Sequence, residues 1–181
     1  MSLKPQSIFT PNLVLRRFIQ GDETALFNNY CGDVESARYL TRLPHANPEQ
    51  TAKFLHKWCD EAWNNCSDEF SWVIASKETN VPIGVFIVMI KNNKGQIHFG
   101  IDRKLWNQGL IPEAGHAVIQ WFEQQPLKLQ SLWTICETSH LRSIRALEKL
   151  GFKQDEILYE HLCFPSLGKK LRDCFVFTRE L

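Results

Sequence analysis

The stretch LWNQGLIPEAGHAVIQWFE, Leu105 to Glu123, places a glycine turn directly before an amphipathic helix. Apolar residues recur at helical spacing behind the turn: Ala114, Ala117, Val118, Trp121 and Phe122. A helix N-terminus exposes unpaired N–H groups and the positive end of the helix dipole, so it attracts phosphate. Gly109 allows a positive φ or a close approach to a ligand. A single glycine is equally compatible with a plain strand-to-helix connection.

A second stretch, CETSHLRSIRALEKLGF from Cys136 to Phe152, has the same order of elements. A strand ends, a short polar loop follows, and Ser143 falls in the first turn of the next helix, which Gly151 should end. The Ser143 hydroxyl can cap backbone N–H groups. It can also donate a proton to a group that lies between the two strands.

Hydrophobic periodicity predicts alternating strands and helices in the rest of the chain. Asn47 and Pro48 are typical of a helix start. Strands are expected at residues 13–18, 70–77, 83–91, 96–102, 131–137, 152–163 and 171–179, and helices at about 25–31, 47–65, from 110 onward, and 141–150. No linker or repeat divides the sequence, so we expect one mixed α/β domain over residues 1–181.

The composition is typical of a compact globular protein. Apolar residues make up 44% and charged residues 23% of the 181 residues, and the net charge is +1. We therefore expect neither a nucleic-acid-binding nor a membrane-binding surface. The six cysteines include no C-x-x-C pair, and the spacing of His56, Cys59 and Cys66 matches no common zinc site. The N-terminal residues lack an apolar signal segment, so we expect a cytoplasmic protein with reduced thiols and no metal.

The two stretches together resemble the GNAT superfamily of acyl-CoA-dependent N-acetyltransferases, in particular its Rim-type group of protein N-terminal acetyltransferases. That group typically reads W-G-K-G-Y-A-T-E-A where this chain has WNQGLIPEA, residues 106–114. It reads roughly C-D-P-R-N-x-A-S-x-R-V-L-E-K-L-G-F at residues 136–152, and TPNLVLRRF resembles its first strand. The resemblance implies a mostly antiparallel central sheet flanked by helices, with a V-shaped split between the fourth and fifth of the expected strands.

The resemblance also implies a site for acetyl-CoA. The pyrophosphate would lie on the backbone N–H groups of Asn107, Gln108, Gly109, Leu110 and Ile111. The pantetheine arm would pair with the strand at Gly100, Ile101 and Arg103, and His140 and Ser143 would lie on the facing side. An amine would attack the thioester directly while backbone N–H groups polarise its carbonyl. Ser143 would then protonate the departing thiolate.

Three positions depart from the pattern of the group. Ile111 replaces a small residue of the glycine motif, and His140 replaces an asparagine. Gln96 stands where the group often has the glutamate that deprotonates the amine, and an amide cannot act as a base.

The candidates for the base are therefore other residues. His98 shares the strand face of Gln96 and has a suitable ordinary pKa. Glu113 and Glu137 are further candidates. Each has a structural alternative: a satisfied strand side chain for His98, a helix-dipole partner for Glu113 and a solvated edge residue for Glu137. A free amine with a neutral fraction also needs no protein base.

The sequence leaves the acceptor open. The Rim-type resemblance favours the α-amino group of a protein or peptide, while polyamines or aminoglycosides remain alternatives. A CoA-binding module without catalysis, or a domain that binds no CoA, is a further possibility because of the three departures. The sequence does not distinguish a monomer from a homodimer.

Overall fold

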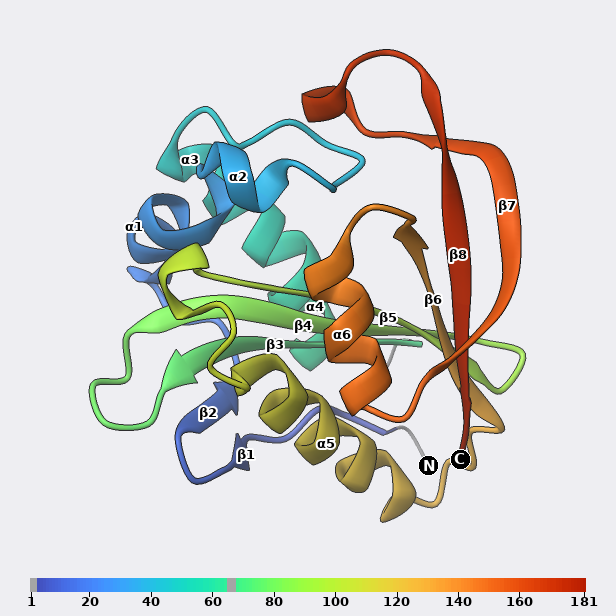
Figure 1. The fold of residues 1–181 in the computed structure, drawn as a ribbon. Helices are drawn as coiled ribbons and strands as arrows, with labels where there is room; N and C mark the ends of the chain where they lie inside the picture. The colour runs from blue at the N-terminus through green and yellow to red at the C-terminus, as the bar shows by residue number, and fades with distance from the viewer. Residues whose placement is uncertain (1–2, 65–67) are drawn as a thin grey trace.

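The computed structural model describes residues 3–64 and 68–181, and in these ranges eight strands form one sheet in the order β1-β2-β3-β4-β5-β6-β8-β7. The strands are β1 Ile8–Phe9, β2 Leu13–Arg16, β3 Glu69–Ser76, β4 Pro82–Lys91, β5 Lys94–Ile101, β6 Ser131–Glu137, β7 Lys153–Cys163 and β8 Leu171–Glu180. Among the strands of the described ranges, only β5 and β6 pair in parallel. The predicted mixed, mostly antiparallel sheet is confirmed (Figure 1).

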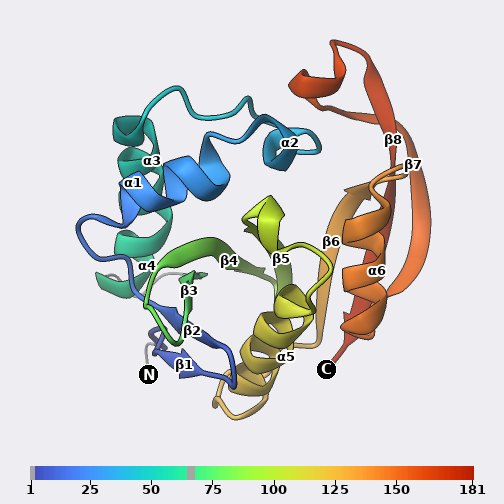
Figure 2. The ribbon, with the colours of Figure 1, turned by 60° about the vertical axis from the view of Figure 1, so that its left-hand side comes forward.

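Helices cover both faces of this sheet (Figures 1 and 2). One layer comprises α1 Asp22–Leu26, α2 Val34–Ala37, α3 Pro48–Leu55 and α4 Glu61–Asn64, with π-helical segments at Phe27–Cys31 and His56–Asp60. The opposite layer comprises α5 Leu110–Glu123 and α6 Leu141–Lys149. Short 3-10 turns lie at Arg103–Leu105 and Pro165–Leu167.

The α5 face of the sheet carries the larger core. Buried side chains of α5 pack against β3, and the rings of Phe70, Trp72, Trp121 and Phe122 meet mostly edge to face. Such aromatic rings bury a large apolar area, so these contacts help to hold α5 on the sheet. A smaller cluster on the other face includes Tyr30 and Val85.

The split of the sheet lies between β5 and β6, the fourth and fifth of the predicted strands. Their parallel register covers three pairs and ends at Gln96 opposite Trp133. The Thr134 hydroxyl then donates to the Ile97 carbonyl at 2.8 Å. Beyond this bond the register ends, so the β6-facing edge of β5 is left without a partner strand up to Ile101.

The helix boundaries agree with the sequence patterns at some ends and differ at others. Asn47 caps α3 through a bond from the Gln50 N–H, and Pro48 is its first residue, as predicted. The helical region expected over 47–65 is confirmed up to Asn64, and Asn65 lies outside the described residues. The helix expected at about 25–31 begins earlier, at Asp22, and changes to π-helical at Phe27. β1 and α2, with two and four residues, are too short to give a periodic signal.

Candidate active site

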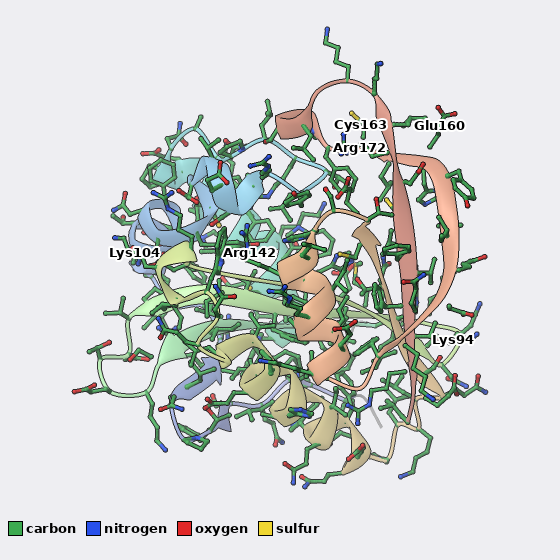
Figure 3. The ribbon with its side chains drawn as sticks, in the orientation of Figure 1. Lys94, Lys104, Arg142, Glu160, Cys163 and Arg172 are labelled. Atoms are coloured by element: carbon green, nitrogen blue, oxygen red, sulfur yellow. The ribbon has the colours of Figure 1, made fainter. Side chains whose placement is uncertain are left out.

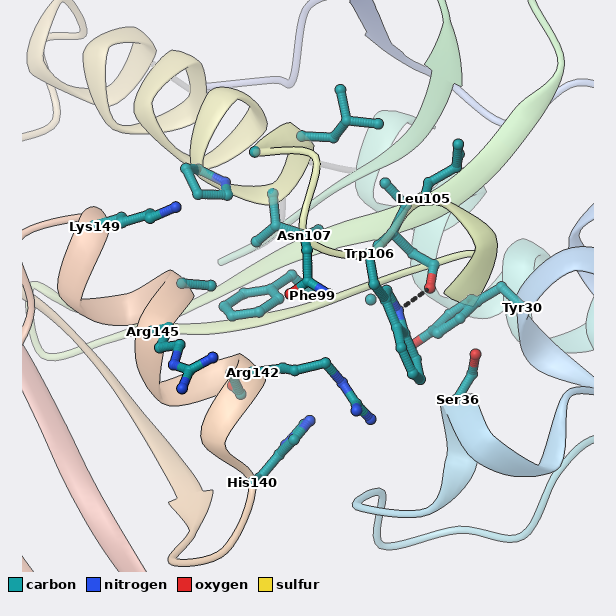
Figure 4. Close-up of a pocket in the computed structure, with 18 of the residues that line it drawn as sticks. Tyr30, Ser36, Phe99, Leu105, Trp106, Asn107, His140, Arg142, Arg145 and Lys149 are labelled. Carbon is teal, nitrogen blue, oxygen red and sulfur yellow. Dashed lines mark hydrogen bonds between the residues drawn. The ribbon is translucent and has the colours of Figure 1, made fainter.

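A cavity of about 270 Å³ lies where the end of β5, the first turn of α5 and one face of α6 converge (Figure 4). Residues of the α1–α2 region close its other side. The residues that line it are Tyr30, Ser36, Leu40, Phe99, Gly100, Ile101, Leu105, Trp106, Asn107, Gly109, Leu110, Ile111, Pro112, His140, Arg142, Ser143, Arg145, Ala146 and Lys149. The cavity therefore joins the two stretches that the sequence singles out.

The first turn of α5 presents free backbone donors to this cavity. Gly109 has φ 80°, in the left-handed region, and an added Cβ would meet no atom within 4 Å. Glycine is therefore required there by backbone conformation and not by space. The Glu113 N–H donates to the Gly109 carbonyl, so the N–H groups of Leu110 and Ile111 precede the first helical bond. The Ile111 side chain is only 9% exposed and packs into the core, so its bulk is largely directed away from these donors.

The floor of the cavity is the end of β5. A Cβ on Gly100 would overlap the ring and hydroxyl of Tyr30, so glycine lets that tyrosine lie directly on the strand. Burial raises the pKa of Tyr30 to about 12, and its hydroxyl stays protonated at neutral pH. Tyr30 belongs to the π-helical segment Phe27–Cys31, so this contact sets the α1–α2 region directly on the end of β5.

Ser143 lies on the α6 side of the cavity, in the first turn of that helix. The thiol of Cys136 on β6 lies beside this hydroxyl and donates to the Glu137 carbonyl at 3.6 Å and the His140 carbonyl at 4.0 Å. Burial raises the pKa of Cys136 to about 11, so this thiol is protonated at neutral pH. The helix ends as predicted, with the Gly151 and Phe152 N–H groups returning to the Glu148 and Leu147 carbonyls.

His140 precedes α6 and also lines the cavity. Its ring stacks on Tyr39 with 4.2 Å between centroids and 13° between planes. Burial, with a smaller contribution from the Arg142 charge, lowers the pKa of His140 to about 4. The imidazole is therefore neutral at pH 7 and adds no charge to the site.

One face of α6 gives the cavity a positive wall, formed by Arg142, Arg145 and Lys149. The Arg142 guanidinium lies over the Trp106 ring at 3.9 Å from the centroid. No acidic residue is among the lining residues, and within residues 3–64 and 68–181 none of the three cations forms an ion pair. Together with the α5 donors, this wall suits a ligand with several phosphate groups.

A family model for the acetyltransferase (GNAT) domain matches residues 12–153. This chain belongs to the GNAT acetyltransferase family. It is an enzyme of acetyl-CoA-dependent acetylation, and the cavity lies at the split of the sheet that the family resemblance implies.

Solved structures of similar fold include other acetyltransferases. RimL, the ribosomal L7/L12 α-N-protein acetyltransferase in complex with coenzyme A, has TM-score 0.83 at 15% identity and covers 97% of this chain and 98% of its own. The microcin C7 self-immunity acetyltransferase MccE, with acetyl-CoA and AMP, has TM-score 0.82 at 15% identity and covers 99% of both chains. The ribosomal-protein-S5-alanine acetyltransferase of Vibrio fischeri has TM-score 0.80 at 17% identity and covers 97% of both. A search of curated proteins finds no significant match.

Two predicted CoA-contacting residues of the acetyltransferase lie beside the cavity and not in its wall. Arg103 forms an ion pair with Asp33 at 3.3 Å between Nε and Oδ1. The Gln108 side chain donates to the Lys104 carbonyl at 3.2 Å. The other predicted contacts, from Gly100 to Ser143, all line the cavity.

The carboxylates proposed as bases in the acetyltransferase are occupied by hydrogen bonds. Glu113 accepts from the Thr10 hydroxyl and from the N–H and side chain of Asn12, which ties α5 to the β1–β2 turn. Glu137 is 2% exposed and accepts from Ser139 and from Arg172. Burial alone would raise both pKa values, but these hydrogen bonds outweigh it and the pKa of each carboxyl is lowered. Both carboxylates are already well satisfied structural groups.

His98 is exposed on the strand face that Gln96 and Gly100 share. It does not line the cavity, although Gly100, two residues along the strand, does. The surrounding protein desolvates the ring and lowers its pKa, so the neutral form predominates at pH 7.

Several lining residues of the acetyltransferase were not predicted. Arg142, Arg145 and Lys149 recur at i, i+3 and i+7, a one-sided basic pattern that the sequence does display. Tyr30, Ser36 and Leu40 lie more than sixty positions before the motifs, and no local pattern connects them with the cavity.

Metal and membrane sites find no support in the part of the chain that is described. No group of three or more His, Cys, Asp or Glu in residues 3–64 and 68–181 can hold a metal ion, and Cys66 lies outside these ranges. None of the described helices combines the length and apolar character that a membrane crossing requires.

Proposed function

We propose that this enzyme transfers an acetyl group from acetyl-CoA to the α-amino group of a protein or peptide, by direct attack of the amine on the thioester. The observation that carries the proposal is the cavity itself. Unpaired N–H groups of α5 and the basic face of α6 border it, and it reaches the unpaired end of β5 beside Ser143. Donors and cations of this kind suit the pyrophosphate and the third phosphate of CoA.

The residues of the chain divide the chemistry among them. The β6-facing N–H groups at the end of β5 would bind the thioester carbonyl and the negative charge that develops on it. Ser143, which lines the cavity in the first turn of α6, would donate its proton to the departing thiolate. His98, neutral at pH 7 and exposed, would accept the proton of the amine directly or through water.

The acceptor is proposed from the similarity to Rim-type proteins. RimL and the Vibrio fischeri enzyme are described as ribosomal-protein acetyltransferases, and their folds match almost the whole of this chain. The same enzymes are less than 20% identical to it, so the acceptor has to be measured.

The decisive experiment combines calorimetry with acetyl-CoA and an assay of thiol release. The acceptor panel should contain peptides with a free N-terminus, the same peptides with a blocked N-terminus, spermidine and kanamycin. We expect binding of acetyl-CoA and thiol release only with the free N-terminal peptides. Release only with spermidine or kanamycin would assign the small-amine alternative. Binding without release from any amine would make the chain a CoA-binding module.

A further inference from the structure

One part of the cavity wall includes two polar side chains, Ser36 and Arg142, that are not among the predicted CoA contacts. We call this the inner wall, formed by Ser36, Trp106, His140 and Arg142. In Figure 4, Arg142 extends from α6 toward Trp106, and Ser36 points toward the same space from α2. Arg142 directly precedes Ser143, so the inner wall lies at the reacting end of the proposed site.

Arg142 has a fixed positive charge without a carboxylate partner. Its guanidinium rests on the Trp106 ring, which holds the group by a cation–π contact. No ion pair to Arg142 occurs among residues 3–64 and 68–181. A guanidinium stacked by its face keeps the N–H groups of its edge available, and these match a carboxylate with two parallel bonds.

Ser36 supplies a second donor without a partner. Its hydroxyl oxygen is buried and has no hydrogen-bond partner among the described residues. A buried hydroxyl that remains unpaired is costly, which favours a ligand that pairs with it. The neutral His140 ring adds hydrogen-bonding capacity to this wall without adding charge.

The phosphates of CoA account for the other two cations but not for Arg142. Arg145 and Lys149 lie one and two turns further along α6, and in Figure 4 Lys149 extends toward the first turn of α5 while Arg145 lies between Lys149 and Arg142. Arg142 lies on the side of Trp106 and Tyr30, away from that turn. The pantetheine arm between the phosphates and the thioester carries no charge at neutral pH. Arg142, labelled in Figure 3, is exposed and forms no ion pair among residues 3–64 and 68–181, so its charge is free to bind another anion that enters the cavity.

We propose that Arg142 and Ser36 form a subsite for a carboxylate that one of the two reactants carries, at the end of the acyl chain or next to the acceptor amine. This inference rests on the proposed function and specifies the substrate class of the same site. Arg142 is the specificity-determining residue, and Ser36 contributes one hydrogen bond. A carboxylate on the acyl chain and one next to the acceptor amine would bind Arg142 in the same way, so the experiment has to distinguish these two sources.

The test compares R142M with the matched control R145M, on the same face of the same helix. The donor pair is acetyl-CoA and succinyl-CoA, and the acceptor pair is two peptides that differ only in aspartate or asparagine at the second position. For each pair, the preference is the ratio of kcat/KM for the member with the carboxylate to kcat/KM for the member without it. We expect R142M to lower this ratio at least tenfold for one of the two pairs. The pair that responds identifies the source. R145M should weaken both donors by the same factor.

Outcomes that contradict the inference are distinct from failure of the proposed function. If R142M weakens acetyl-CoA, succinyl-CoA and both peptides equally, Arg142 serves the phosphates and the carboxylate subsite is wrong. R142K keeps the positive charge but lacks the two parallel N–H donors of the guanidinium. It should retain part of the preference, which separates the loss of charge from misfolding. Failure of the wild type to bind acetyl-CoA in calorimetry would overturn the proposed function, and the inference with it.

Discussion

At the scale of single residues, Ser143 and His98 can be separated by the step that each serves. S143A removes the proton donor for the thiolate, so we expect kcat to fall by about 10²-fold or more with the affinity for acetyl-CoA nearly unchanged. H98Q should instead remove the rising limb that His98 gives the pH–rate profile below about pH 6.5, because an amide does not titrate. Steady-state kinetics from pH 5 to 8 and calorimetry measure both effects. An unchanged kcat in S143A would remove the serine from the acid role, and a persistent limb in H98Q would assign the base elsewhere.

At the scale of elements, the start of α5 depends on one left-handed residue. Gly109 has φ 80° and open space around the missing Cβ, so G109A should lower the free energy of unfolding by about 1–2 kcal/mol through backbone strain alone. G109N should lose less, because asparagine tolerates this conformation. Urea denaturation measures the difference, and calorimetry tests whether the distorted turn also weakens acetyl-CoA binding. Equal stability of G109A and the wild type would show that the turn relaxes without strain.

The same elements show how far the sequence determines the site. The turn at Gly109, the first turn of α6 and the split after Gln96 follow from local patterns and from the family motifs. The ends of these helices could be predicted from the sequence because glycine and N-cap residues affect only the backbone within a few positions of themselves. Tyr30 and Ser36 reach the cavity only through tertiary packing, and the hydrogen bonds that occupy Glu113 come from residues about a hundred positions away. Such contacts depend on the folded arrangement, which periodicity and spacing do not encode.

At the scale of the whole molecule, the buried His45 and the partly buried His140 should determine how stability falls at acid pH. Burial, with a smaller contribution from Arg42, lowers the pKa of His45 from 6.5 to about 4, and His140 is lowered to about 4 as well. His45 is 6% exposed, bonds the Thr51 hydroxyl at 2.9 Å, and has no carboxylate recorded beside it in the described residues. As pH falls from about 6.5 to about 4, these two histidines become protonated in the unfolded chain but stay neutral in the folded chain.

The free energy of unfolding should therefore decline through this window, by about 1.4 kcal/mol per pH unit for each histidine at most. The lowered pKa values of Glu113 and Glu137 act below it, since their stabilisation is lost only as pH falls below about 4.5. Urea denaturation at pH 7, 6 and 5 measures the slope. H45Q keeps a hydrogen-bonding side chain but does not titrate, so its slope should be about half that of the wild type, and an unchanged slope would contradict the role of His45.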